Sequence, residues 1–508
     1  MALLVDFHIF SESENLPLKL KSKPYYLDLN LLKILSYISL ILYSLTFSAC
    51  FRAAFSPDLG ELYNKSIQQS APTRNPVIVI PGVLGSNLVD SATGKSIWGA
   101  WDGEFANPKI DKEARLIALP LDPSLDPFRL EDSVTNAGAL ERIRLRVFGF
   151  PVGFKAYAQL LVTLGAGGYI DQTMASSQGN SIDYGDEHFT CFQFDYDWRK
   201  SNAANAAKLD SFIKEKKKYI ENEYRRRYKT EPKEIKFDIV AHSMGGLLSR
   251  YYLRYGNQPL NLEGPLPVLN WAGAKHVDKL ITVGTPNLGS LHSFQSLLKG
   301  RKDSIFLPFY SPVLMGSFPS LYELLPRNSD TPVSLKGKQK QIDLFDSQIW
   351  EHYNWGLLSS DKHLKVLLPN IQTPDERRST AKEHLSRLLK YAKRFHQTLD
   401  LKARPPEGLS IYLFTGDANP TAEKGKVNKY GELSFTMHSP GDGIVTRKSA
   451  LADKRNENSN KPKLISPIGW TGVYFIFEDH LGLIEDNTFS DNLLYLLLER
   501  PAFSRPVL

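Results

Sequence analysis

One short stretch of this 508-residue chain carries the residue types of a nucleophilic site: Phe-Asp-Ile-Val-Ala-His-Ser-Met-Gly-Gly, from Phe237 to Gly246. Phe237–Val240 is a β-forming run, a helical pattern starts after it, and Ser243 lies on the turn between the two. Small residues stand two positions before and after the serine, at Ala241 and Gly245, as a sharp strand-to-helix reversal requires. Such a turn presents the hydroxyl to a carbonyl carbon. We therefore predict that Ser243 is the nucleophile of an acyl-transfer site.

A serine nucleophile needs a base and an acid, which in this kind of sheet follow it in the order acid, then histidine. His480 has the expected position, because it follows the apolar run 472–477 and precedes the last helical pattern; His438 is the alternative base. Asp442 lies in Ser-Pro-Gly-Asp-Gly-Ile-Val, where glycines would let a carboxylate approach an imidazole; Asp417, at the end of another strand run, is the alternative acid. We predict Asp442 and His480 as partners of the serine.

Acyl transfer also needs donors for the oxyanion that forms on the attacked carbonyl. The sequence Ile80-Pro-Gly-Val-Leu-Gly-Ser86 leaves an apolar strand run through a glycine-rich turn. The backbone N–H groups of Val83, on this turn, and of Met244, next to the nucleophile, are the predicted donors. An ordinary glycine-bearing loop is the alternative interpretation of this turn.

The elements that must position these residues alternate along the chain. Strand patterns occur at 76–80, 192–196, 235–240, 279–283, 409–415 and 472–477, and helical patterns at 203–228, after Ser243 and at 490–498. This alternation predicts an α/β fold with a mainly parallel sheet flanked by helices. A segment at approximately 290–406, richer in Pro and Lys, is predicted to be an inserted cap or lid region of a domain spanning 76–508. Residues 50–75 form a polar lead-in.

The N-terminal segment 1–49 has the composition of a targeting sequence. Four lysines precede the uncharged, largely apolar stretch 34–49, which is short for a membrane span. Phe47-Ser48-Ala49-Cys50 resembles a bacterial lipoprotein cleavage box, in which Cys50 would become the lipid-modified first residue; the alternative is an anchor helix that is never cut. We therefore predict an extracytoplasmic protein, secreted or membrane-anchored.

Composition limits the classes of partner and cofactor. The formal net charge of +7 is small for this length and does not favour nucleic acid as a partner. The two cysteines, Cys50 and Cys191, exclude a disulfide scaffold, and Cys191 falls in an apolar run typical of a core. The sequence has no zinc-type His/Cys spacing and no phosphate-binding glycine loop followed by Lys, so we predict neither a metal nor another cofactor. The oligomeric state stays open.

Taken together, the motifs resemble the lecithin:cholesterol acyltransferase-like family over roughly Pro76 to the end of the chain. In chain order they are Pro81-Gly-Val-Leu-Gly-Ser86, Tyr196-Asp-Trp-Arg199, Ala241-His-Ser-Met-Gly-Gly246, Gly284-Thr-Pro286, Phe318-Pro-Ser-Leu-Tyr-Glu-Leu-Leu-Pro326, Gly441-Asp-Gly-Ile-Val445 and Asp479-His480. Two departures are visible: the cysteines of the disulfide-closed lid of the animal enzymes are lacking, and Ile444 replaces the usual Thr.

The resemblance implies an α/β-hydrolase in which Ser243, Asp442 and His480 form a triad that attacks an ester of a phospholipid or related lipid at a membrane or lipoprotein surface. It also implies that the acyl group passes through the serine to water or to an acceptor alcohol. Trp98, Phe309 and Phe318 are candidate substrate-binding residues, with aromatic packing as the alternative role. The alternative functions are a triacylglycerol or carboxyl ester lipase and a surface lipoprotein that binds lipid without catalysis.

Overall fold

The computed structural model describes residues 58–68, 74–101, 105–139, 142–147, 150–155, 157–173, 188–231, 234–302, 308–327, 332–336, 341–455 and 462–499. All of them belong to one compact unit, Asp58–Leu508. The predicted segment 1–49 and Cys50, with its predicted lipidation, lie outside the described residues.

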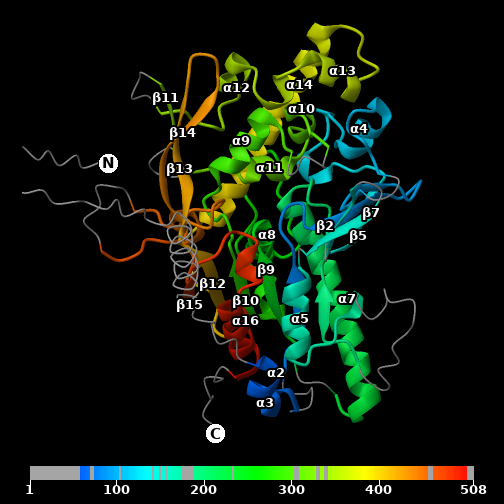
Figure 1. Cartoon of the computed structure of the whole chain (residues 1–508), viewed down its shortest axis with the longest axis vertical. Helices are drawn as coiled ribbons and strands as arrows, with labels where there is room; N and C mark the ends of the chain where they lie inside the picture. The colour runs from blue at the N-terminus through cyan, green and yellow to red at the C-terminus, as the bar shows by residue number, and fades with distance from the viewer. Residues whose placement is uncertain are drawn as a thin grey trace, which may run out of the picture. The chain divides into compact units, whose positions relative to one another are not determined.

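Within these residues, six parallel strands form the central sheet, in the order β15-β12-β10-β9-β1-β8 (Figure 1). They are β1 (Val77–Ile80), β8 (Cys191–Gln193), β9 (Phe237–His242), β10 (Val277–Val283), β12 (Ser410–Gly416) and β15 (Gly472–Ile476). Each overlaps a predicted strand. Strand β8 is shorter than the predicted strand 192–196, because it ends at Gln193. The N–H of Tyr196 donates to the Ser86 hydroxyl at 3.1 Å and not to a neighbouring strand of the central sheet. The predicted α/β fold with a parallel sheet is confirmed.

Helices cover both faces of this sheet. They are α5 (Ala158–Ala166), α7 (Asn202–Tyr228), α8 (Met244–Tyr255) and α16 (Asn487–Leu494). Successive side chains of a strand point to opposite faces. Accordingly, Val77 and Val79 belong to the hydrophobic cluster that contains α5 and α16. Ile78 and Ile80 belong to the cluster that contains α7 and α8. A strand buried on both faces is apolar throughout, which is why β1 and β9 stand out in the sequence.

Between β10 and β12 the chain forms helices that lie beyond one end of the sheet in Figure 1, within the segment predicted as a cap. They are α9 (Leu291–Lys299), α10 (Pro312–Met315), α11 (Pro319–Glu323), α12 (Ser347–Tyr353), α13 (Asp361–Leu367) and α14 (Pro374–Asp400). A small sheet accompanies them, in the order β11-β13-β14. Its strands are β11 (Val333–Leu335), β13 (Asn419–Val427) and β14 (Leu433–Gly441).

Shorter elements complete the described part of the chain. The helices are α2 (Leu59–Leu62), α3 (Asn64–Gln68), α4 (Asp111–Ile117) and α15 (Arg447–Ala450). Two small sheets have the orders β3-β2-β5 and β4-β6-β7. Their strands are β2 (Ser86–Asp90), β3 (Ser96–Trp98), β4 (Ala100–Trp101), β5 (Val134–Ala139), β6 (Arg142–Val147) and β7 (Phe150–Lys155). Among the described residues, we find no helix with the length and apolar character needed to span a bilayer.

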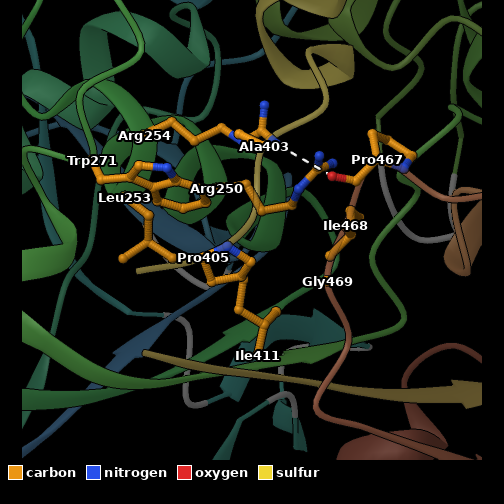
Figure 2. A pocket seen from close by; sticks show the side chains of 10 residues that line it. All are labelled: Arg250, Leu253, Arg254, Trp271, Ala403, Pro405, Ile411, Pro467, Ile468 and Gly469. Atoms are coloured by element: carbon orange, nitrogen blue, oxygen red, sulfur yellow. Dashed lines mark hydrogen bonds between the residues drawn. The ribbon is translucent and has the colours of Figure 1, made fainter. Parts of the chain in front are cut away.

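Two buried arginines of α8 hold the C-terminal end of the cap helix α14. Arg250 Nη2 donates to the Leu399 carbonyl at 2.9 Å, and Arg254 Nη1 donates to the Leu401 carbonyl at 2.7 Å. Figure 2 shows both side chains beside a small cavity, with Arg254 also donating to the Pro467 carbonyl. Carbonyls at the end of a helix carry partial negative charge, which stabilises these cations. The helix that follows Ser243 is thereby fixed to the cap.

A buried carboxyl forms a second connection between the helices that follow β10 and the helices that flank the central sheet. Glu323 of α11 is 0% exposed, and its Oε2 accepts hydrogen bonds from Asn202 N at 2.8 Å and Asn202 Nδ2 at 2.6 Å, at the start of α7. Burial raises the pKa of Glu323 to about 8, against an ordinary value of 4.5, because hydrogen bonds from Asn202 only partly offset the loss of solvation.

We expect Glu323→Gln to flatten the dependence of stability on pH. Since the folded pKa is raised, the folded state keeps a proton that the unfolded chain releases, so stability is greatest below pH 4.5 and falls as pH rises toward about 8. Glutamine has the shape of the protonated acid and does not titrate. Thermal unfolding measures the free energy of unfolding near pH 5 and pH 9. Between these two values, the stability of the variant relative to the wild type should rise by roughly 2–4 kcal/mol, since one pKa unit is worth ~1.4 kcal/mol. Parallel pH profiles would contradict this assignment.

Candidate active site

Ser243 stands on the sharp turn between β9 and α8, with φ 52° and ψ −124°. A non-glycine residue held in a sparsely populated backbone region costs about 1–3 kcal/mol, and such strain gathers at functional turns. Glycine is required on the helical side of the turn, because a Cβ on Gly245 would lie 2.6 Å from the Pro81 carbonyl oxygen. A Cβ on Gly246 would overlap the side chain of Thr285. The predicted strand–turn–helix around the serine is therefore present.

Three side chains from distant parts of the chain form a hydrogen-bonded series at this turn. His480 Nε2 lies 2.9 Å from Ser243 Oγ, and His480 Nδ1 lies 2.8 Å from Asp442 Oδ2. A carboxylate that accepts the Nδ1–H leaves Nε2 free to accept the serine proton. The structure thus brings together the residues predicted as nucleophile, acid and base.

Asp442 follows β14 on a turn that fixes its carboxylate. Its Oδ1 accepts backbone N–H groups from Ile444 at 2.9 Å and Val445 at 2.6 Å, while Oδ2 faces His480. Burial alone would raise the pKa of Asp442, but the adjacent imidazole and these N–H donors outweigh it and hold the pKa below its ordinary value. The carboxylate is therefore ionised and aimed at the imidazole.

Glycines at the ends of two strands make room for the acid and the base. Gly284, at the end of β10, has a φ of 58°, and a Cβ there would lie 3.2 Å from both Asp442 Oδ2 and His480 Cε1. A Cβ on Gly416, the last residue of β12, would lie 2.7 Å from Asp442 Cβ. A side chain at either position would push the carboxylate or the imidazole away from the serine.

The alternative acid and base from the sequence take other roles. Asp417 accepts a hydrogen bond from Arg447 Nη1 at 3.0 Å, in an ion pair beside the site. His438 lies on β14 with an exposed side chain. Of these four candidates, Asp442 and His480 are the two that are hydrogen-bonded in series with Ser243.

The glycine-rich turn after β1 lies directly against the nucleophile. A Cβ on Gly82 would come within 2.7 Å of Ser243 Cβ. The next residue, Val83, and the first residue of α8, Met244, are the predicted oxyanion donors. Within the part of the chain that the structure describes, neither N–H donates a hydrogen bond to a protein acceptor. The first N–H groups of a helix have no partner inside the helix, so Met244 is suited to an external acceptor.

The Tyr-Asp-Trp-Arg segment is hydrogen-bonded to the start of this turn. Tyr196 Oη donates to the Pro81 carbonyl at 2.9 Å. Arg199 is fully buried, and its Nη2 forms ion pairs of 2.7 Å with both Asp197 and Asp132. In this motif the Asp–Arg pair is therefore buried structure, and Tyr196 joins the segment to the turn beside Ser243.

The three predicted substrate-binding aromatics have different environments. Trp98 is 5% exposed, and its Nε1 donates to the Leu84 carbonyl of the oxyanion turn at 2.8 Å. Phe318 is 1% exposed and packs edge-on against Trp198, with 5.7 Å between the ring centroids. Phe309 is 44% exposed. Trp98 therefore steadies the turn and Phe318 packs in the core, while binding of substrate by any of the three stays a prediction.

Apolar side chains flank the acid and the base at the surface. Phe477 and Leu481, on either side of His480, are 79% and 51% exposed, and Ile444, two residues after Asp442, is 39% exposed. Large apolar side chains gathered at a functional site are typical of contact with an apolar ligand or a lipid surface.

Sequence reasoning missed several residues that the site depends on. His242 and Tyr157 form a buried hydrogen bond of 2.9 Å beside the nucleophile, and Gly284 and Gly416 provide the space described above. The position of His242 next to Ser243 could have indicated its importance. Tyr157 belongs to no motif, and only the fold brings it to the site.

Other reactive groups are less prominent. Cys191 is a free, buried thiol in β8, as predicted. Across the described ranges, no three His, Cys, Asp or Glu side chains are grouped so that they could hold a metal ion.

Comparison with known proteins agrees with this geometry. Residues 144–390 match the model of the lecithin:cholesterol acyltransferase family. Over this range, which is just under half of its length, the chain is similar to that family. The matched range contains Ser243 and the Tyr-Asp-Trp-Arg segment and ends before Asp442 and His480. The match supports an acyl hydrolase or acyltransferase of lipid esters in general terms.

Among solved structures, the Tle4–Tli4 complex includes a chain that superposes with a TM-score of 0.52 at 14% identity. The match covers 84% of the present chain and 98% of that chain. This likeness shows a shared fold. Lipase 1 from Pelosinus fermentans matches with a TM-score of 0.32 at 13% identity, covering 84% and 100% of the two chains. The mature lipase BlEst2 from Bacillus licheniformis gives 0.28 at 13% identity, covering 85% and 95%. No curated protein sequence matches the chain.

Proposed function

We propose that this protein is a serine-dependent acyltransferase or phospholipase that cleaves ester bonds of phospholipids or related lipids through an acyl-enzyme. The observation that carries the proposal is the hydrogen-bonded series from Ser243 through His480 to Asp442, on a strained turn at the end of a parallel sheet. The family match supports lipid esters as the substrate class.

In the first half of the reaction, His480 Nε2 takes the hydroxyl proton as Ser243 Oγ attacks the ester carbonyl carbon. Asp442 stabilises the imidazolium that forms. The N–H groups of Val83 and Met244 donate to the oxyanion. When the tetrahedral intermediate collapses, the ester C–O bond breaks and the leaving alcohol takes the proton from His480.

In the second half, the same imidazole deprotonates water or an acceptor alcohol, which attacks the acyl-serine and restores the free hydroxyl. Release of a fatty acid makes the protein a phospholipase, and formation of a new ester makes it an acyltransferase. The exposed Phe477, Leu481 and Ile444 beside the acid and base favour a substrate with apolar chains.

We also propose that the protein acts outside the cytoplasm, attached through Cys50 or through an uncut N-terminal segment, on the basis of the targeting composition of residues 1–49. Cell fractionation of the wild type and of Cys50→Ala tests this. Membrane attachment lost only in the variant would favour lipidation, attachment kept in both would favour the uncut segment, and a wholly cytoplasmic protein would refute export.

A fluorophosphonate probe tests the acyl-enzyme directly. The probe should label the wild type on Ser243, identified by mass spectrometry, and should not label Ser243→Ala. The exposed serine Ser211, on α7, provides the control, and Ser211→Ala should label like the wild type. A lipid-binding protein without catalysis would take no label while still sedimenting with vesicles, and that result would overturn the proposal.

The products decide between the remaining alternatives. We expect phospholipid vesicles to be cleaved at least about ten times faster than a triacylglycerol emulsion, with products resolved by mass spectrometry in the presence and absence of a long-chain alcohol or sterol. Faster cleavage of triacylglycerol would instead identify an ester lipase. New ester bonds to the acceptor would identify transfer.

A further inference from the structure

The residue before the nucleophile, His242, has no part in the reaction described above, yet both of its ring nitrogens are hydrogen-bonded. Its side chain is buried at the end of β9. Nδ1 lies 2.9 Å from Tyr157 Oη, and Nε2 lies 2.9 Å from the main-chain oxygen of His480. The rings of His242 and His480 are 4.9 Å apart between centroids.

The donor and acceptor in each hydrogen bond follow from the two groups at the ends of the series, an N–H and a carbonyl. The N–H of Gly82 can only donate, and it donates to Tyr157 Oη at 2.9 Å. The carbonyl of His480 can only accept, so Nε2 of His242 carries the hydrogen. Nδ1 is then the acceptor for the one hydrogen of the tyrosine hydroxyl. The series therefore runs from the Gly82 amide through the tyrosine and the imidazole to the base.

The charge state of His242 agrees with this direction. Burial and, to a smaller extent, the nearby His480 lower the pKa of His242 to about 3, against weaker opposing effects of its hydrogen bond to the His480 main chain and of Asp442. A neutral imidazole has one donor and one acceptor, as the series requires, and adds no positive charge beside the imidazolium that forms on His480.

We propose that Tyr157 and His242 are positioning residues that hold the oxyanion turn and the main chain of the base in fixed relation to the nucleophile. The inference rests on the proposed function, because it concerns the same site. It connects three segments: the turn at Gly82, the elbow at Ser243 and the loop that carries His480. That loop needs such a connection, since Phe477 and Leu481 on either side of the base point largely into solvent.

Removing the tyrosine hydroxyl is the first test. Tyr157→Phe keeps the ring and leaves both Gly82 N–H and His242 Nδ1 without their partner. We expect kcat for a soluble short-chain ester to fall by 10- to 100-fold with KM within about threefold, because displacement of a catalytic group by ~1 Å costs of the order of 100-fold. Tyr169→Phe is the matched control: Tyr169 is equally buried in the same core, and its hydroxyl has no hydrogen-bond partner in the described chain. It should keep the wild-type kcat.

Substitutions of His242 separate positioning from general support of the fold. Gln places an N–H donor where Nε2 stands, so His242→Gln should keep kcat within about fivefold of the wild type. Asn keeps an acceptor toward Tyr157 but is too short to reach the His480 carbonyl, so His242→Asn should lose as much kcat as Tyr157→Phe. Melting temperatures measured in parallel show whether the losses follow stability instead.

The outcomes are distinct. Two results with an active wild type would overturn the positioning role and leave the proposed function intact. One is a Tyr157→Phe variant that keeps kcat within twofold of the wild type. The other is an equal loss of kcat in the Gln and Asn variants of His242. If Tyr157→Phe does not fold, the comparison of Gln with Asn at position 242 still decides. A wild type that neither turns over esters nor takes the fluorophosphonate label would refute the proposed function itself.

Discussion

His480→Ala is expected to lower kcat by about a millionfold, with KM for a soluble ester nearly unchanged. In serine hydrolases, kcat falls by roughly this factor when either the nucleophile or the base is removed, because neither group can act without the other. In this protein the imidazole is the group 2.9 Å from the Ser243 hydroxyl, so no proton acceptor remains once it is gone. Steady-state kinetics on a chromogenic short-chain ester measure the effect.

The same experiment includes its own consistency check. Ser243→Ala should lose as much activity as His480→Ala, and the double variant should lose no more than either, since residues that act as a unit are not additive. Losses that multiply in the double variant would show that the two side chains act independently, and the acyl-enzyme mechanism proposed above would then be wrong.

Asp442→Asn is expected to lower kcat by about ten-thousandfold while the protein stays folded. The amide has the same shape, but its NH₂ group cannot accept the Nδ1–H of the imidazole, so His480 adopts the tautomer that presents a proton to the serine instead of accepting one. The carboxylate that stabilises the imidazolium is lost as well. Kinetics and a melting curve on the same preparation measure both effects.

Asp417→Asn is the matched control for this variant, because Asp417 directly follows β12 and was the other candidate acid. Its partner is Arg447, which is half exposed, and such surface ion pairs contribute about 0–1 kcal/mol. We expect kcat within twofold of the wild type. A large loss at 417 together with a small loss at 442 would exchange the two assignments.

The sequence was sufficient to predict the parallel sheet and the order of the reacting residues. Strands buried on both faces, such as β1 and β9, are continuous apolar runs that can be recognised without a structure. The elbow is local, since Ala241, Ser243 and Gly245 belong to a single turn. His480 could be selected because it follows the last strand run, and Asp442 because it lies in a glycine-bearing turn close to His480 in chain order.

The parts that were not predicted depend on contacts across the fold. In the hairpin β13–β14, the buried residues of β13 do not alternate regularly, and β14 is mostly exposed between its two ends, so the hairpin lacks the apolar alternation that marks a half-buried strand. The hydrogen bond between Tyr157 and His242 joins residues 85 positions apart with no pattern in common. Likewise, Gly284 and Gly416 are ordinary glycines in the sequence, and their necessity is visible only when the side chains of Asp442 and His480 are in place.

Insertion of the cap between β10 and β12 has a consequence for biosynthesis. Ser243 and His480 are 237 positions apart. At ~5–20 residues per second, a ribosome adds the nucleophile roughly 12–50 s before it adds the base. The nascent polypeptide therefore holds an unreactive hydroxyl throughout this interval. Under the proposed mechanism, ester cleavage can begin only after β15 and the loop behind it have been translated.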